Sequence, residues 1–372
     1  MTRTPHLIAA ALLIPHICVA QSVDYSPRLV DVGGQRLEVV QRGQGHPVVV
    51  VEAGSGLDWR NWIPIMDSIA PLTTVVSYSR AGYGNSPPAS APRTPLQVTS
   101  ELHALLRAID AAPPYVLVGH SLGGLYMQVF AAQYPDEVAG LLLVDSSHER
   151  GWLEFDALSP GFLADTKQEI DSLEVARPEE GRTQEWIDLW PNMLRGALPE
   201  AHPLPDVPTV VLTSLQTDPE STLVVQTEAG RQLWRSLHSE FFAGTIQGAH
   251  VVTQSGHNIH MEEPGLVVES IRSLVKGVRV LDGEILSDEE RAVYEGVYQL
   301  SPSCDYSIFS SGDQLFAGCT GQNPVRLKRR GDHVFILSSD ANIRLEFVVQ
   351  GDRAAGFTLY RAGRRGSVRR KP

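Results

Sequence analysis

The chain has 372 residues, enough for more than one domain, because single domains usually contain about 100 to 200 residues. Its composition is typical of a globular protein, and its net charge of -12 at pH 7 argues against a general nucleic-acid-binding protein. We therefore expect two domains and no nucleic-acid partner.

Residues 1–20 have the pattern of a secretory signal peptide. Arg3 precedes a mostly apolar run at residues 7–19, and small residues stand at 18 and 20, directly before Gln21. The run is too short to span a bilayer, and no later segment is suited to do so. We expect an exported protein, periplasmic or secreted. A lipid anchor on Cys18 is the less favoured alternative.

Strands and helices then alternate along residues 21–277. Helical patterns separate β-branched or apolar runs at residues 35–41, 47–51, 73–78, 115–118, 138–144, 208–214 and 249–253. This alternation indicates βαβ units, hence an α/β fold with a mostly parallel, doubly wound sheet. Ligand chemistry is expected at the carboxyl ends of its strands.

One strand runs directly into a Gly-x-Ser-x-Gly turn and an apolar helix, the pattern of a nucleophile elbow. The turn is Gly119-His120-Ser121-Leu122-Gly123. We expect Ser121 to occupy strained backbone, with glycines where a Cβ would collide with the neighbouring strand or helix. The helix start directs free N–H groups and a partial positive charge towards any anion that forms there. Ser121 is therefore the candidate nucleophile.

A serine nucleophile needs a base and an acid that orients the base. His257 directly follows the last predicted strand of the sheet and is the best-placed base. His260 is a weaker candidate, and His120, inside the elbow, cannot turn back on Ser121.

Two aspartates at strand ends are candidates for the acid. Asp218 follows the strand at 208–214, and it is preferred because the order serine, acid, histidine suits this arrangement. Asp145, which ends the strand at 138–144, is the alternative. The one that does not pair with the histidine is expected to be a structural carboxylate that caps a turn or helix.

An oxyanion hole requires two N–H donors. Leu122 follows the nucleophile and supplies one. The small-residue loop at 53–56 is expected to supply the other from Gly54, with Ser55 as the alternative. Since the sequence contains no metal-ligand cluster and no phosphate-binding glycine motif, we expect neither a metal nor a cofactor.

From residue 146 to about 205 the alternation stops. This segment is rich in Trp, Leu, Asp and Glu and is punctuated by prolines, which predicts a helical lid over the strand ends. Its aromatic residues are expected to pack the lid down or to wall a substrate pocket.

Residues 278–290 are expected to be a connector, and residues 291–372 a small antiparallel β-barrel or sandwich. Short strands are predicted at 296–300, 305–310, 314–319, 325–328, 333–337, 344–350 and 356–360. Cys304 and Cys319 are expected to form a disulfide across two neighbouring strands, with two free thiols as the alternative. The basic tail at 361–371 is expected to be solvated and frayed.

The elbow, together with the loop Arg80–Ser86 and the dipeptide Gly256–His257, resembles the α/β-hydrolase superfamily over about residues 28–277. Glu52–Gly56 resembles a bacterial branch with Glu-Ala-Gly-Ser-Gly in place of the commoner His-Gly loop. The resemblance implies Ser121 as nucleophile, His257 as base, a carboxylate at Asp218 or Asp145, and a lid after Asp145. The chain departs from the pattern at Ser79, where relatives commonly have aspartate, which leaves open whether a loop-stabilising carboxylate is present but does not affect the triad.

The C-terminal strands are similar to the small β-barrel domain that trails some serine β-lactamase-like and peptidase-like enzymes. The similarity rests on Tyr294–Leu300 and Gln314–Ala317, and it implies an accessory role without a second active site.

These features predict an exported serine hydrolase that cleaves small-molecule carboxylic esters through an acyl-enzyme. Amidase or peptidase action with the same triad is one alternative, and a non-catalytic ligand-binding protein is another. A surface adhesion module, with the C-terminal domain as its working part, is a third.

Overall fold

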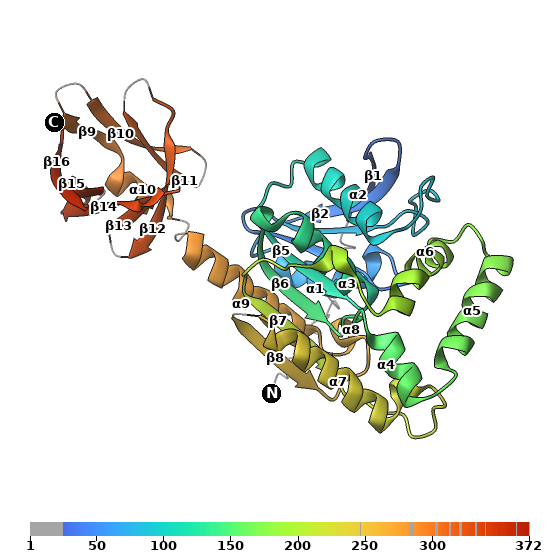
Figure 1. Cartoon of the computed structure of the whole chain (residues 1–372). Helices are drawn as coiled ribbons and strands as arrows, with labels where there is room; N and C mark the ends of the chain where they lie inside the picture. The colour runs from blue at the N-terminus through green and yellow to red at the C-terminus, as the bar shows by residue number, and fades with distance from the viewer. Residues whose placement is uncertain are drawn as a thin grey trace, which may run out of the picture.

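A computed structural model describes residues 25–245, 247–282, 286–301, 304–311, 314–319, 322–331, 333–338, 340–361 and 363–371. The predicted signal peptide lies outside the described residues. The described part contains an α/β unit and, beyond the end of its last helix, a closed antiparallel barrel (Figure 1). No helix in this part has the length and apolar character that crossing a membrane requires.

The α/β unit is built on an eight-stranded sheet in the order β1-β2-β4-β3-β5-β6-β7-β8 within the described residues. The strands are β1 (Arg28–Asp31), β2 (Arg36–Arg42), β3 (Val48–Glu52), β4 (Val75–Ser79), β5 (Tyr115–His120), β6 (Val138–Val144), β7 (Thr209–Ser214) and β8 (Gly248–Thr253). Strands β3 to β8 are parallel, and β1 and β2 form an antiparallel edge. The central strands are continuous apolar runs because helices cover both of their faces. The predicted fold class is confirmed.

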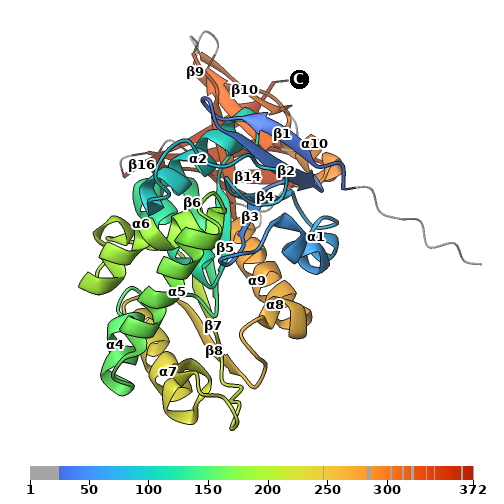
Figure 2. The same cartoon turned by 90° about the vertical axis from the view of Figure 1, so that its right-hand side faces the viewer.

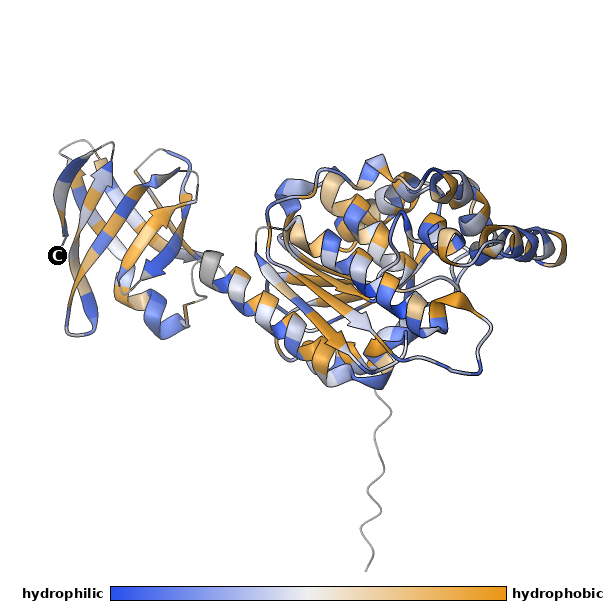
Figure 3. Cartoon of the chain, turned by 60° about the horizontal axis from the view of Figure 1, so that its bottom comes forward, coloured by the Kyte–Doolittle hydropathy of each residue, from blue (hydrophilic) through white to orange (hydrophobic). Residues whose placement is uncertain are grey.

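Two sets of helices make those covering layers, and apolar strands lie between them in Figure 3. One face packs against α1 (Ile63–Ile69) and α9 (Pro264–Asp282). The other packs against α2 (Pro95–Ala108), α3 (Leu122–Gln133) and α7 (Glu228–Ala243). Two residues set the start of α2. The Thr94 hydroxyl accepts a hydrogen bond from the backbone N–H of Gln97, and Pro95 takes the first helical position.

The segment predicted to be a lid contains α4 (Gly151–Leu158), α5 (Phe162–Ala176) and α6 (Gly181–Arg195), which lie together on one side of the unit in Figure 2. Leu189 and Met193 of α6 join a buried apolar cluster with Leu125 and Tyr126 of α3. Helix α6 is therefore anchored to the helix that follows the elbow.

The barrel is closed by antiparallel pairing of eight strands in the described part. They are β9 (Gly296–Ser301), β10 (Cys304–Ser311), β11 (Gln314–Cys319), β12 (Val325–Gly331), β13 (Val334–Leu337), β14 (Asp340–Gln350), β15 (Arg353–Arg361) and β16 (Arg364–Arg370). Leu286 and the end of α10 (Asp288–Tyr294) belong to the barrel core, whereas α9 continues to Asp282. The barrel unit thus begins inside the segment predicted to be a connector.

The prediction of a frayed basic tail is wrong. Strand β16 pairs with both β15 and β9 and closes the barrel. Val368 points into the core with 4% exposure, whereas Arg365 and Arg369 are exposed. The arginines hide this alternation because long charged side chains can occupy the outer face of a strand.

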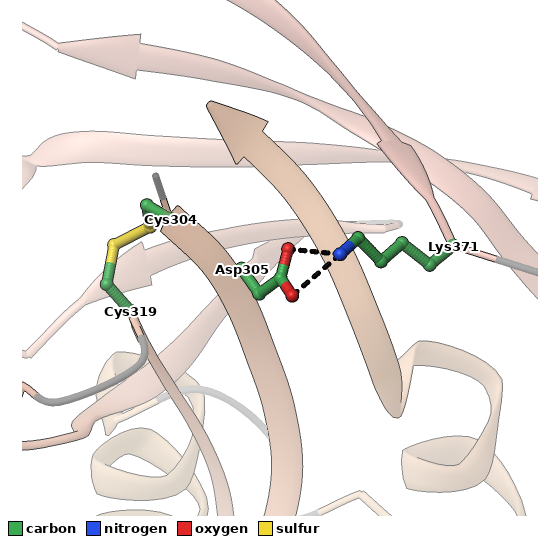
Figure 4. The surroundings of a disulfide bond; sticks show 4 residues. All are labelled: Cys304, Asp305, Cys319 and Lys371. Atoms are coloured by element: carbon green, nitrogen blue, oxygen red, sulfur yellow. Dashed lines mark hydrogen bonds and ion pairs between the residues drawn. A yellow bond between two sulfur atoms is a disulfide. The ribbon is translucent and has the colours of Figure 1, made fainter. Parts of the chain in front are cut away.

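A disulfide joins Cys304 at the start of β10 to Cys319 at the end of β11, with a Cα–Cα distance of 5.4 Å (Figure 4). Beside it, the Lys371 ammonium donates to the Asp305 carboxylate at 2.6 Å. The disulfide and this ion pair connect three segments at one side of the barrel.

Candidate active site

Ser121 occupies the turn between β5 and α3 with φ 53° and ψ -124°, a conformation that residues other than glycine rarely adopt. The surrounding chain leaves little room. A Cβ on Gly119 would lie 2.6 Å from the carbonyl oxygen of Gly123, and one on Gly123 would lie 2.5 Å from that of Glu52. The elbow therefore holds the serine side chain at the carboxyl end of a central strand.

His257 lies in the loop after β8, and its Nδ1 is 2.7 Å from Oδ2 of Asp145. Asp145 is fully buried at the end of β6. It also accepts hydrogen bonds from the Ser214 N–H at 2.9 Å, the Ser214 hydroxyl at 2.8 Å and Nε1 of Trp234 at 2.9 Å. Burial alone would raise the pKa of Asp145, but the His257 contact and the other donors outweigh it and lower the pKa to about 2. This carboxylate is ionised at neutral pH.

The preference for Asp218 over Asp145 does not agree with this geometry. Asp218 is exposed in the loop after β7, where its carboxylate accepts the backbone N–H of Glu220. Strand β7 instead supplies Ser214, whose two donors hold Asp145. Asp218 thus has the turn-capping role expected of the carboxylate that does not pair with the histidine.

Ser121 and His257 line the same cavity, which has a volume of about 230 Å³. Four aromatic residues form much of its wall: Trp152, Phe155, Phe162 and Trp234. Its polar lining comes from Ser147, His148, Gln226 and Arg231. A larger cavity of about 700 Å³, beside α7 and residues 202–207, contains none of the predicted site residues. The smaller cavity is therefore the candidate substrate site.

The two histidines that the sequence offered as weaker candidates, His120 and His260, have structural partners. The Nε2 of His120 lies 3.0 Å from the backbone oxygen of His257, and burial lowers the pKa of His120 well below its ordinary value. His260 is buried, bonds Asn61 and packs against the ring of Trp62. Burial lowers the pKa of His260 to about 4. Both rings are neutral at pH 7 and frame the His257 loop.

The loop predicted to complete the oxyanion hole lies against the elbow. A Cβ on Gly54 would be 3.2 Å from Cβ of Ser121. The Ser55 hydroxyl accepts a hydrogen bond of 2.9 Å from Nε1 of Trp186 in the lid helix α6. The Leu122 N–H stands at the first position of α3, beside Ser121. The choice between Gly54 and Ser55 as donor stays a prediction.

Buried Arg80 connects this loop to the lid. Its Nη1 donates to Glu52 at 2.6 Å and to the Ala53 carbonyl at 2.7 Å, and its Nη2 donates to the Gly54 carbonyl at 3.0 Å. The carboxylate of Glu185 in α6 accepts from Nε at 2.5 Å and from Nη2 at 3.1 Å. These five contacts match the five N–H donors of a guanidinium. The lid and the oxyanion loop therefore share one buried cation.

Residues 48–270, more than half of the chain, match the model of the alpha/beta hydrolase family. The chain belongs to this family.

Two relatives and one solved structure illustrate the match. The hydrolase is 28% identical over 228 residues to the uncharacterized protein YqjL of Bacillus subtilis, covering 61% of this chain and 83% of YqjL. It is 32% identical over 108 residues to an AB hydrolase superfamily protein of Gibberella zeae, but this match covers only 28% of this chain and 34% of that relative. The crystal structure of DBJA aligns with a TM-score of 0.53 at 15% identity, over 69% of this chain and 99% of DBJA. That likeness concerns the fold alone.

A carboxylate beside Ser79 is supplied by another strand of this α/β hydrolase. Glu38 of β2 accepts from the Ser79 hydroxyl at 3.1 Å, and from the backbone and side chain of Asn85 at 3.0 and 2.6 Å. The loop at 80–86 therefore has a carboxylate partner although residue 79 is serine.

Sequence reasoning also missed Ser214, Trp234 and Glu185 as parts of the site. Ser214 ends a predicted strand, so its position at the reactive edge of the sheet was a usable signal. Glu185 is 105 residues from Arg80 in the chain, and no local pattern marks that pair. Among the described residues, no group of three or more His, Cys, Asp or Glu side chains is arranged to hold a metal ion.

Proposed function

We propose that this α/β hydrolase is an exported serine hydrolase that cleaves carboxylic esters through an acyl-enzyme. One observation carries the proposal: His257, hydrogen-bonded to buried Asp145, lines the same cavity as the strained Ser121. That set of groups has the roles of nucleophile, base and orienting acid.

The mechanism follows from the protonation states. Since Asp145 is ionised and accepts from Nδ1 of His257, the other ring nitrogen is free to take the Ser121 proton. The serine oxygen attacks the ester carbonyl, and the N–H groups of Leu122 and Gly54 stabilise the resulting oxyanion. His257 then protonates the departing alkoxide. Water, activated by the same histidine, attacks the acyl-enzyme and releases the acid and free Ser121.

The cavity favours a small ester with an apolar part. Aromatic side chains from α4, α5 and α7 offer wide apolar surfaces, and the volume of about 230 Å³ suits a small molecule better than a polymer. Two features support export: the signal-peptide pattern and the Cys304–Cys319 disulfide, since disulfides persist mainly in oxidising compartments.

A fluorophosphonate probe tests the nucleophile. We expect the wild type to be labelled and to hydrolyse short-chain p-nitrophenyl esters, whereas Ser121→Ala loses both. Ser172→Ala is the control because Ser172 is exposed on the lid helix α5, away from the cavity lining. A folded wild type that is inert to both reagents would instead support a non-catalytic binding protein.

The leaving group separates esterase from amidase. Each p-nitrophenyl ester is compared with the p-nitroanilide of the same acyl group, and we expect a large preference for the ester. Faster anilide cleavage would assign the protein to the amidases. Removal of the barrel should leave probe labelling of Ser121 intact if the barrel is accessory, and export is tested by N-terminal sequencing of protein from the periplasm or medium.

A further inference from the structure

Arg231 is a cation that lines the candidate substrate cavity without a complete set of hydrogen bonds. Its side chain is only 9% exposed. Nη1 donates to the Ser214 hydroxyl at 3.0 Å and lies 3.7 Å from Asp145. Nε is buried without a hydrogen-bond partner in the described part of the chain. Within those residues, the protein uses only one nitrogen of this guanidinium.

Asp145 does not require Arg231 as a partner. Its Oδ1 already accepts from the Ser214 N–H and from Trp234, and its Oδ2 accepts from the Ser214 hydroxyl and from His257. A cation beside the acid also opposes the imidazolium that forms on His257 during the reaction, because like charges repel. The catalytic groups alone therefore do not account for Arg231.

The cavity itself fits an anion. The described lining residues include Arg231, Gln226, Ser147 and His148 but no carboxylate side chain. A guanidinium in a largely dry, aromatic-walled site has a desolvation cost, and Asp145 at 3.7 Å offsets it only in part because its two oxygens already accept four other hydrogen bonds. An anionic ligand would offset the rest. Arginine binds carboxylates particularly well, since its planar fork can donate two parallel hydrogen bonds.

We propose that Arg231 binds a free carboxylate on the substrate, so that the site prefers esters that carry one. Such compounds include half-esters of dicarboxylic acids. Substrate binding gives the terminal nitrogens of Arg231 an anionic acceptor, while the aromatic walls hold the carbon skeleton and Ser121 attacks the ester carbonyl. This inference rests on the proposed ester hydrolase function.

Paired substrates test the proposal. The kcat/KM for mono-p-nitrophenyl glutarate is compared with that for p-nitrophenyl pentanoate, which has the same chain length without the charge. A second pair, 4-carboxyphenyl butyrate and phenyl butyrate, places the carboxylate on the leaving group. We expect the wild type to prefer the charged member of at least one pair, mainly through KM. The preference should be on the order of 10- to 100-fold, which is the range for hydrogen bonds to charged groups.

For each variant, the kcat/KM of the charged ester is divided by that of its neutral partner. The ratio is used because Arg231 also contacts Ser214, so its loss will slow both substrates. Arg231→Gln should abolish the preference, and Arg231→Lys should keep part of it. Arg235→Gln is the matched control, since Arg235 is exposed on the same helix. Free glutarate should inhibit the wild type competitively and should inhibit Arg231→Gln much less.

Two results would overturn the inference: a wild type without preference in either pair, or an Arg231→Gln variant that slows both members of a pair equally. The second result would make Arg231 a positioning residue for Ser214 and Asp145. Hydrolysis of the neutral esters in either case leaves the proposed function standing, whereas inertness towards all four esters counts against the function itself.

Discussion

Glu185 of α6 contributes one negative charge to the buried Arg80 network. Replacing it by glutamine removes that charge and keeps the shape of the side chain. Glu185 is 0% exposed, and its carboxylate also accepts the Tyr83 hydroxyl at 2.7 Å. The glutamine amide keeps one oxygen that can accept a hydrogen bond. Its NH2 group replaces the other oxygen, so a donor would then face the donors of Arg80 or Tyr83. We therefore expect Glu185→Gln to weaken both the docking of α6 and the position of the oxyanion loop.

The expected cost follows from the burial of the pair. Removing one partner of a buried ion pair costs about 3–5 kcal/mol where the remaining charge is left without compensation. Arg80 keeps Glu52 as a partner at 2.6 Å, so we expect the lower end of that range, about 3 kcal/mol. In a domain of this size, about 2–4 °C of melting temperature are lost per kcal/mol, so we expect a decrease of roughly 6–12 °C. In the variant, Arg80 would also be held less firmly against the Ala53 and Gly54 carbonyls. Small misplacements of catalytic groups can cost about 10²-fold in rate.

Thermal and urea unfolding give the stability change, and steady-state kinetics on a p-nitrophenyl ester give kcat and KM. Glu180→Gln, which removes an exposed charge just before α6, is the matched control and should unfold within about 0.5 kcal/mol of the wild type. The effect on activity should appear mainly in kcat, because the oxyanion forms after binding. A Glu185→Gln protein as stable and as fast as the control would refute the coupling of lid and loop.

Three further outcomes follow from the structure. Asp145→Asn should lower kcat by roughly 10⁴-fold through loss of the orienting acid, whereas Asp218→Asn should stay within about twofold of the wild type, as measured by ester hydrolysis. Because the pKa of His260 falls from 6.5 to about 4 in the folded state, the unfolded chain takes up that proton first on acidification. The free energy of unfolding should therefore decrease between about pH 6.5 and pH 4, and urea titrations of His260→Gln should show a shallower decrease. Deletion of residues 364–372 removes β16 and leaves β9 and β15 with unpaired edges, so limited proteolysis should cut the barrel rapidly while Ser121 remains open to the probe.

The sequence predicts helices, strands and turns of this hydrolase well where the residues that define them are adjacent in the chain. The run Tyr115–Leu122 carries a strand, a sharp turn and a helix start in direct succession, and these elements are present with Ser121 in the left-handed region. The reading of β16 failed because its inward alternation depends on Val368 among arginines. A rule that looks for alternating apolar residues cannot recognise a strand in which Val368 is the one large apolar residue.

The acid was misjudged because chain order says nothing about which strand end faces the histidine. Asp145 and Asp218 both follow strands, and the deciding feature is the set of donors from Ser214 and Trp234 around Asp145. Those donors come from β7 and α7, which the tertiary fold brings together. Arg80 and Glu185 are a similar case, since they meet only once the lid has docked.

The lid divides into a helix that joins the buried Arg80 network, α6, and a part that lines the cavity. Among the described residues of segment 146–205, the cavity lining comes from the residues just before α4, from α4 and from the first turn of α5, with none from α6. Substitutions in the cavity-lining part of the lid would change the cavity wall without touching the contacts of Arg80 with α6 and with the loop at 53–56. Members of the family can therefore diverge in selectivity while this buried network is kept.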